Sequence, residues 1–347
     1  MATLTANELT AHVRGHSFFS RLAVREKRLG RRLLRDADLV EARLAECAAQ
    51  ATDPRVTAVV GHLVAAGGKR MRPLLTLLAA EFGTPSAPGV IDAAVVAELV
   101  HTASLYHDDV MDRAVVRHGV PSVNAQWGNA VAVKAGNWLL ARAARLSAGL
   151  DYTAVTLQAE VSERLIRGQM QELTGPAHPD DRLGHYLGVV SDKSAALLAF
   201  SLRLGALQAG APAHVGDALA EYGEQLGIAF QISDDLIDIT SSSSLLGKEQ
   251  GQDLALGVCS LPVLLALTDT DPRDDELRDL LADAAGVRGE NHRRALALLR
   301  ESPVLDRTRS IMDEHLDKAR SALAGLPAGP PRRALDALCD FVAARQQ

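Results

Sequence analysis

The stretch AELVHTASLYHDDVMD, residues 97–112, is an apolar segment with helical spacing that runs directly into a group of aspartates. A second stretch, LGIAFQISDDLID at residues 226–238, repeats this arrangement. Each ends in D-D-x-x-D, and at about 100° per residue its first and last aspartates lie one turn apart on one side of a helix. The two clusters comprise Asp108, Asp109 and Asp112, and Asp234, Asp235 and Asp238.

Both clusters are unfavourable for an isolated helix. Like charges four residues apart repel, and aspartate is a poor helix former, so each helix loses stability unless a cation lies between the carboxylates. Hard oxygen ligands suit Mg²⁺, which takes one or two carboxylates, keeps waters and adds substrate phosphate oxygens. One such cluster could equally be a solvated acidic helix end. Two of them in one helical chain favour a diphosphate clamped through bridging metal ions.

Composition narrows the ligand classes. The chain has 347 residues, 47% hydrophobic and 23% charged, with a formal net charge of −6. A mildly acidic protein has no general attraction for nucleic acid or anionic lipid, so an anionic ligand needs a local basic pocket. Three cysteines in no metal-ligand spacing argue against a disulfide framework and suit a reducing compartment. With no signal peptide or apolar window of spanning length, we expect a cytoplasmic protein without a transmembrane segment.

Helical periodicity continues along the chain, and we find no convincing strand pattern. Glycine and proline occur where helices are expected to end, at 83–89, 175–179, 210–212 and 325–331. The sequence therefore predicts an all-α protein. Residues 1–50 are Arg- and Ala-rich and predict a helical extension, for packing or dimer contact, in front of a domain at 51–347.

Cationic groups could complement the acidic clusters. The segment GGKRMRP, residues 67–73, has glycines that allow close backbone approach to a ligand, and its Lys69 and Arg72 are spaced to share one helix face. Taken singly, such basic residues more often face solvent. Further polar candidates, each with a plain surface role as its alternative, are Arg117, His118, Lys193, Ser194, Lys248, Gln169 and Glu172.

Taken in order, these motifs resemble those of the trans-prenyltransferases, or polyprenyl diphosphate synthases. The resemblance runs from about residue 59 to 262 and includes GGKRMRP, HTASLYHDDVMD, GQMQE, FQISDDLID and GKEQGQDL. It implies a single large antiparallel helix bundle around a deep central cavity of the isoprenoid synthase type. It also implies a homodimer, about three bound Mg²⁺ ions, and isopentenyl diphosphate and an allylic diphosphate as substrates.

The resemblance also assigns roles to individual residues. Lys69, Arg72 and His101 match the positions that hold isopentenyl diphosphate. The six aspartates match the two metal clusters. The positions around the allylic diphosphate are Arg117, Lys193, Ser194, Gln231 and Lys248, with Gln169 and Glu172 near the metals. Asp108, Asp109, Asp112, Lys193, Asp234 and Asp235 are the expected catalytic group.

Two positions depart from the family pattern. Where the family has two consecutive arginines, this chain has Arg117 followed by His118, which is expected to weaken isopentenyl diphosphate binding or make it sensitive to pH near neutrality. Where a lysine commonly follows the glycine at Gly257, this chain has Val258, so one charge at the allylic site is missing.

Product length is expected to depend on the turn before the first cluster. Residues four and five before Asp108 are Ser104 and Ala103, where short-chain members of the family often place bulky aromatics. Small side chains there would leave a tunnel open for the growing tail, which predicts a product of C20 or longer.

Two other functions share these motifs. A class I terpene cyclase also ionises an allylic diphosphate, but cyclases usually line their cavity with aromatic faces, and aromatics are only 3% of this chain. An inactive partner subunit of a heteromeric synthase would tend to lose the aspartates, whereas both clusters are intact here.

Overall fold

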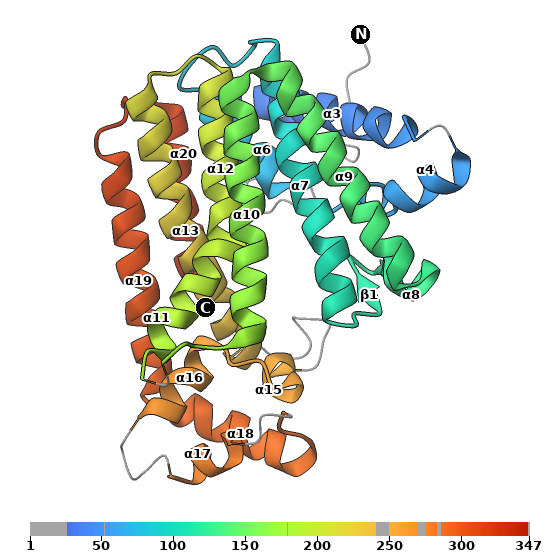
Figure 1. Ribbon diagram of the computed structural model, residues 1–347. Coiled ribbons are helices and arrows are strands. Elements are labelled where there is room, and N and C mark those ends of the chain that lie inside the picture. The colour runs from blue at the N-terminus through green and yellow to red at the C-terminus, as the bar shows by residue number, and fades with distance from the viewer. Residues whose placement is uncertain are drawn as a thin grey trace. The chain divides into compact units, whose positions relative to one another are not determined.

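The computed structural model describes residues 26–345 except 52, 179, 241–249, 270–274 and 283–285. Helices dominate this part of the chain, which confirms the all-α class (Figure 1). Its strands are β1 (Val116–Arg117) and β2 (Val120–Pro121), which pair as an antiparallel hairpin. This hairpin was not predicted, because two-residue strands are too short to show an alternating pattern.

The chain forms two compact units, which are described separately. The first comprises Met1–Leu165, Leu197–Glu221 and Gly325–Leu335, and the second comprises Ile166–Ala196, Tyr222–Ala324 and Asp336–Gln347. The predicted division into an extension at 1–50 and a domain at 51–347 stays a prediction.

The first unit contains both strands and most of the N-terminal helices. Its elements are α3 (Lys27–Ala49), α4 (Pro54–Val60), α5 (His62–Ala66), α6 (Met71–Ala80), α7 (Gly89–Met111), α8 (Val123–Trp127), α9 (Asn129–Leu150), and parts of α10 (Tyr152–Thr174), α12 (Ala196–Gln208), α13 (Ala213–Thr240) and α20 (Pro330–Ala344).

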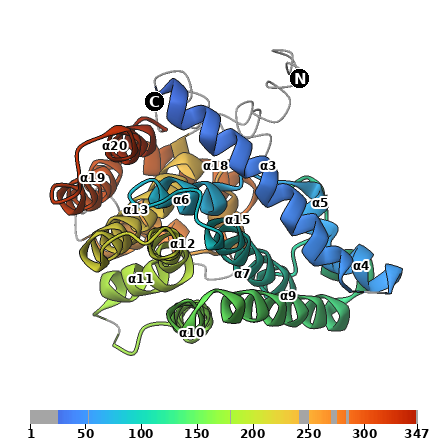
Figure 2. The same ribbon diagram turned by 90° about the horizontal axis from the view of Figure 1, so that it is seen from above.

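Helix α7 lies at the centre of this unit, in contact with α3, α6 and α9 (Figures 1 and 2). It runs antiparallel to α9: a Cβ on Gly89, at the start of α7, would lie 3.1 Å from Leu150 Cδ2 at the end of α9. Near the other end, a Cβ on Gly136 would lie 2.8 Å from His107 Cδ2. Glycine at position 136 therefore lets α9 approach α7 closely beside the first aspartate cluster.

Helix α7 is apolar on nearly every side, as expected of a core helix. By length and composition alone, this helix could cross a membrane. The expectation that no apolar window reaches spanning length was therefore wrong. However, 67% of its most apolar window is buried inside the protein. Its composition is therefore explained by burial.

Helix α3 is amphipathic, with one buried stripe that includes Leu29, Leu33, Val40 and Leu44. The spacing of these residues places them on one helix face. This face packs on α6 and α7, so residues 27–49 form part of the core of the first unit. Residues 1–25 lie outside the described part.

The second unit contains the C-terminal helices. Its elements are α11 (Arg182–Val190), the π-helical turn η1 (Ser191–Ala195), α15 (Gln252–Leu256), α16 (Leu261–Thr268), α17 (Asp275–Leu281), α18 (Gly289–Glu301), α19 (Val304–Leu323), and the remaining parts of α10, α12, α13 and α20.

Helix ends occur where glycine and proline predicted them. Helix α6 ends at Ala80 before the 83–89 segment, α10 ends at Thr174, α12 ends at Gln208, and α19 ends at Leu323. Here the sequence sufficed because glycine and proline act on the backbone locally, whatever the tertiary contacts.

Candidate active site

The first aspartate cluster forms the end of α7. Asp112 is the C-cap residue, and its backbone N–H donates to the carbonyl oxygen of Asp108 at 2.8 Å, so these two residues are one helical turn apart as predicted. Asp109 is fully buried. Its Oδ1 accepts from Arg117 Nε at 2.8 Å and lies 2.6 Å from Arg117 Nη2. Its Oδ2 is buried with no hydrogen-bond donor among the described residues.

The β1–β2 hairpin returns Arg117 to Asp109. Its two central residues, His118 and Gly119, have φ values of 52° and 78°. Positive φ at both positions is the requirement of a type I′ turn, and histidine is among the residues that tolerate it best. The Asn124 side chain supports the loop by donating to the carbonyl oxygens of Asp109 and Ala114, each at 3.0 Å. The departure at His118 thus falls on a turn position.

The basic loop differs from the prediction that Lys69 and Arg72 share a helix face. Helix α6 begins only at Met71, and Arg70 before it is left-handed with a φ of 44°. Helical spacing therefore does not apply across this segment. Lys69 is exposed in the loop, whereas Arg72 lies in the first turn of α6.

Positive groups gather between this loop and α7. Burial lowers the pKa of Arg72 to about 10, so it stays cationic at neutral pH, and its Nε has no partner among the described residues. Burial, followed by the charges of Arg72, His118 and Arg117, holds the pKa of His101 well below its usual value. A Cβ on Gly68 would lie 3.3 Å from His118 Cε1. The structure thus places Arg72, His101 and His118 near one another, and among the described residues the Arg72 Nε donor has no partner, whereas no contact joins Lys69 to this group.

The second aspartate cluster ends α13. Asp235 is buried and accepts from Tyr186 Oη at 2.6 Å, from the Leu261 backbone N–H at 2.8 Å and from Gln231 Nε2 at 3.2 Å. Burial is the main cause that raises the pKa of Asp235 to about 6, against the lowering effect of these bonds. Tyr186 and Leu261 were missed by sequence reasoning, since nothing near either residue signals this contact.

The outer aspartates of this cluster are also engaged. Asp238 accepts from the backbone N–H groups of Gln252 and Asp253, each at 3.1 Å, and so caps the start of α15. Asp234 Oδ1 lies 2.6 Å from Arg345 Nη2, and the Arg345 guanidinium lies 4.3 Å from the centre of the Phe230 ring. Arg345, near the end of the chain, was another residue that sequence reasoning missed.

The predicted allylic-site residues Lys193 and Ser194 lie in η1, between α11 and α12. Lys193 Nζ pairs with Glu172, and Ser194 Oγ donates to Gln231 Oε1 at 3.0 Å. Gln169 is buried, and its Oε1 has no partner in the described part of the chain. Glu172 thus pairs with Lys193 of η1, and the role of Gln169 and Glu172 in a polar ring around the metals stays a prediction.

Two features pack η1 against its neighbours. Asp192 is buried and accepts from Arg167 Nε at 2.7 Å and Nη2 at 3.1 Å. Gly168 lies so close that a Cβ there would be 2.8 Å from Asp192 Cβ. A π-helical turn frequently marks a functional site, and here it carries both polar candidates.

The remaining predicted positions are less informative. Lys248 lies outside the described residues. Val258 is exposed. Ala103 is fully buried in α7, and Ser104 is half-buried with its Oγ donating to the His101 carbonyl oxygen at 2.8 Å.

The donor set fits a hard divalent cation. All six candidates are carboxylates, Asp109 has a buried oxygen with no donor in the described part of the chain, and the raised pKa of Asp235 reflects burial that disfavours its charge. A nearby cation would offset both costs. Among the described residues, no three His, Cys, Asp or Glu side chains are grouped to hold a metal by themselves. Magnesium usually completes such sites with waters and phosphate oxygens.

Comparison with known proteins gives a consistent result. The polyprenyl synthetase family model matches residues 53–299. The chain is 46% identical over 285 residues to a nonaprenyl diphosphate synthase of Mycobacterium tuberculosis, covering 82% of this chain and 85% of that protein. It is 39% identical over 282 residues to a dimethylallyltranstransferase of the same organism, covering 81% and 85%.

Solved structures agree. A decaprenyl diphosphate synthase from Rhodobacter capsulatus has a TM-score of 0.83 at 34% identity, over 92% of this chain and 99% of that one. A geranylgeranyl pyrophosphate synthase from Corynebacterium glutamicum, complexed with calcium and isoprenyl diphosphate, has a TM-score of 0.82 at 39% identity, over 92% and 97%. This chain therefore belongs to the polyprenyl synthetase family of trans-prenyltransferases.

Proposed function

We propose that this chain is an all-trans polyprenyl diphosphate synthase that condenses isopentenyl diphosphate with an allylic diphosphate to give a product of C20 or longer. The observation that carries the proposal is the pair of aspartate clusters at the ends of α7 and α13, together with the cationic group around Arg72. The names of the relatives, which include nonaprenyl and geranylgeranyl diphosphate synthases, support this product range.

The proposed reaction proceeds by ionisation. The allylic C1–O bond breaks, and its electron pair stays on the diphosphate, where Arg117, Lys193 and Lys248 would stabilise the charge. Bound magnesium would be held by the six aspartates and would supply Lewis acidity toward the diphosphate. We propose that the metal is Mg²⁺, with about three ions, as the family resemblance implies. The relative complexed with calcium and isoprenyl diphosphate supports the use of a divalent cation.

The second substrate supplies the electrons for the new bond. Lys69, Arg72 and His101 would hold isopentenyl diphosphate so that its double bond attacks the allylic cation. A new C–C bond forms, and a proton then leaves the adjacent carbon to give the trans double bond. As the family resemblance implies, we assign the proton to the departed diphosphate, and no side chain among the described residues stands out as the base.

Incubation of the purified chain with isopentenyl diphosphate, Mg²⁺ and each of several allylic primers tests this proposal. Mass spectrometry is expected to show prenyl diphosphates of C20 or longer. Hydrocarbon formed from an allylic diphosphate alone would indicate a terpene cyclase. Activity that appears only with a second protein would indicate a partner subunit, as the name "heptaprenyl diphosphate synthase component 2" of one relative suggests for that protein.

Bulk added beside the first cluster is expected to shorten the product. In the Ala103→Phe and Ser104→Phe variants, the ring would occupy the proposed path of the tail, and we expect the main product to be at least one isoprene unit shorter. Chromatography of the products measures this. Because Ala103 is fully buried, its variant carries a risk of misfolding, whereas Ser104 is half-buried. An unchanged product length in a folded Ser104→Phe variant would contradict the tunnel hypothesis.

His118 is expected to make isopentenyl diphosphate binding depend on pH. Burial, followed by the charge of Arg117, lowers the pKa of His118, so the imidazole is neutral at pH 8 and gains its proton only as the pH falls. Protonation would favour an anionic ligand, so KM for isopentenyl diphosphate should fall severalfold as the pH is lowered from 8 to below the ordinary histidine pKa of about 6.5. Steady-state kinetics should show a lower and flatter KM in His118→Arg. Equal pH profiles for the two proteins would contradict this role.

We further propose a cytoplasmic homodimer. An apolar strip on α10, formed by Ile166, Met170 and Leu173, is 58–70% exposed, and such residues at helical spacing are typical of an interface. The three cysteines are unpaired, as suits a reducing compartment. Analytical ultracentrifugation of wild type and Met170→Glu should give a dimer and a monomer, respectively.

A further inference from the structure

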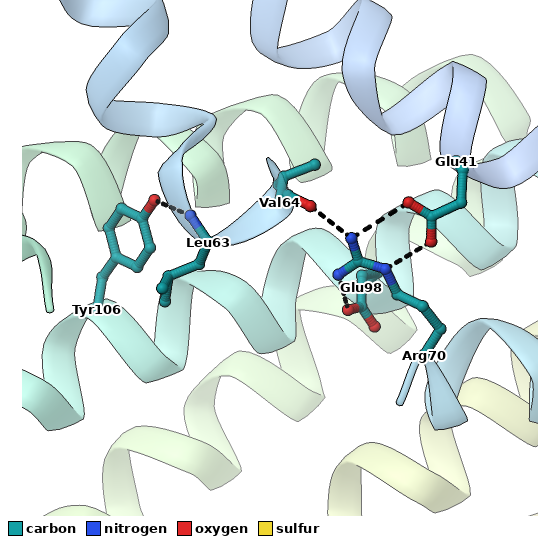
Figure 3. A network of polar contacts seen from close by, with 6 residues as sticks. All are labelled: Glu41, Leu63, Val64, Arg70, Glu98 and Tyr106. Atoms are coloured by element: carbon teal, nitrogen blue, oxygen red, sulfur yellow. Dashed lines mark hydrogen bonds and ion pairs between the residues drawn. The ribbon is translucent and has the colours of Figure 1, made fainter. Parts of the chain in front are cut away.

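Arg70 stands between Lys69 and Arg72 in the basic loop, but unlike Lys69 its side chain is buried, at 8% exposed. Its guanidinium is surrounded by acceptors (Figure 3). Nη1 donates to Glu98 Oε1 at 2.8 Å, and Nη2 donates to the Val64 carbonyl oxygen at 2.7 Å. Nε and Nη2 donate to the two carboxylate oxygens of Glu41 at 2.6 and 3.2 Å.

The backbone at Arg70 is strained. Its φ of 44° is left-handed, and two glycines with positive φ precede it at 67 and 68. A non-glycine residue keeps this conformation only where its surroundings hold it there. Among the described residues, three other than glycine have positive φ, and all three are basic. Arg70 lies in the basic loop, Arg113 follows the end of α7, and His118 lies in the β1–β2 turn. Arg70 is the one whose side chain is fixed by two carboxylates.

This conformation determines the direction of the loop. Arg70 is the N-cap residue of α6, so its φ and ψ set how the segment carrying Lys69 joins the helix carrying Arg72. Bidentate pairing of an arginine with a carboxylate adds geometric specificity as well as energy. The two carboxylates come from different helices, Glu41 from α3 and Glu98 from α7.

We propose that Glu41 and Glu98 are positioning residues for isopentenyl diphosphate, which act through Arg70 to fix the loop that presents Lys69 and Arg72. Glu41 precedes residue 53, where the match to the family model begins. Helix α3 is therefore part of the substrate-binding apparatus of this chain as well as a packing element. This inference rests on the proposed isopentenyl diphosphate site.

The test compares Glu41→Ala with a control on the same two elements. Arg32 of α3 pairs with Glu81 at the C-cap of α6, with its Nε donating to Glu81 Oε1 at 2.9 Å. Arg32→Ala thus removes an ion pair between α3 and α6 at the end of α6 remote from the loop. Calorimetric titration with isopentenyl diphosphate, without metal or allylic substrate, measures binding independently of turnover.

We expect Glu41→Ala to raise Kd for isopentenyl diphosphate about tenfold, because a charge-assisted pair that fixes the loop is lost. KM should rise in parallel while kcat changes less, and Glu41→Asp should recover part of the affinity. Arg32→Ala should lower Tm without changing Kd. Glu98→Gln, which keeps the side-chain volume, should behave like Glu41→Ala.

Equal Kd values for folded Glu41→Ala and Arg32→Ala would overturn the inference and leave the proposed function intact. Failure of the wild-type protein to bind isopentenyl diphosphate, in the titration and in the presence of Mg²⁺ and an allylic primer, would instead overturn the proposed function.

Discussion

Asp108→Asn is expected to lower kcat for chain elongation by at least about a thousandfold, because it removes one charge from the proposed ligands of the diphosphate-bound metal. Asparagine keeps the size of the side chain. The substitution also relieves the repulsion between Asp108 and Asp112, one turn apart, so the metal-free protein should unfold at the same or a slightly higher temperature. Steady-state kinetics over a range of Mg²⁺ concentrations, with a thermal melt of each variant, measures both effects.

Asp92→Asn supplies the matched control. Asp92 lies in the first turn of α7 and accepts from Arg43 Nε of α3 at 2.8 Å. The same substitution there removes the charge from an ion pair between α3 and α7, on the helix that carries Asp108. We expect its activity and Mg²⁺ dependence to match those of the wild type. If Asp108→Asn kept its activity within tenfold and its Mg²⁺ dependence unchanged, the assignment of the first cluster as a metal site would be wrong.

Gly227→Ala is expected to destabilise the protein by about 2 kcal/mol or more and to reduce kcat severalfold. Gly227 lies in α13 against η1. A Cβ at this position would overlap the Cα of Ala195 and would lie 2.8 Å from its Cβ. Ala195 ends the π-helical turn that carries Lys193 and Ser194, so we expect relief of the overlap to displace this turn and its polar side chains. Chemical denaturation gives the stability, and kinetics gives the activity.

Gly188→Ala provides the comparison in the same unit. Gly188 lies in α11, and a Cβ there would meet no atom within 4 Å. Alanine should therefore stabilise this variant by about 0.5–1 kcal/mol, through helix propensity alone. Equal stability of the Gly188→Ala and Gly227→Ala proteins would show that the close approach at η1 is not a constraint.

Sequence alone predicted those features that depend on local chemistry. The ends of α6, α10, α12 and α19 followed from glycine and proline. The one-turn spacing of Asp108 and Asp112 followed from helical geometry.

Tertiary contacts determined the rest. Asp109 and Asp235 carry the same local signal as their neighbours, yet each is buried and paired, with Arg117 and with Tyr186 respectively. Arg70 was not distinguished from its basic neighbours, because the carboxylates that hold it come from α3 and α7. Glu98 could have been noticed, since a single acid within the apolar run of α7 signals a buried partner.

The predicted isopentenyl diphosphate ligand His101 and the predicted metal ligand Asp108 lie on one continuous helix, α7. Asp108 follows His101 by seven positions, which places it about 10 Å further along the helix axis and at nearly the same angle around it. Side-chain substitutions between them leave this spacing intact, whereas insertion or deletion of one residue would rotate one ligand by about 100° away from the other. In this chain, side-chain changes between His101 and Asp108 can therefore alter the cavity, but a change in the length of the segment would separate the two predicted ligands.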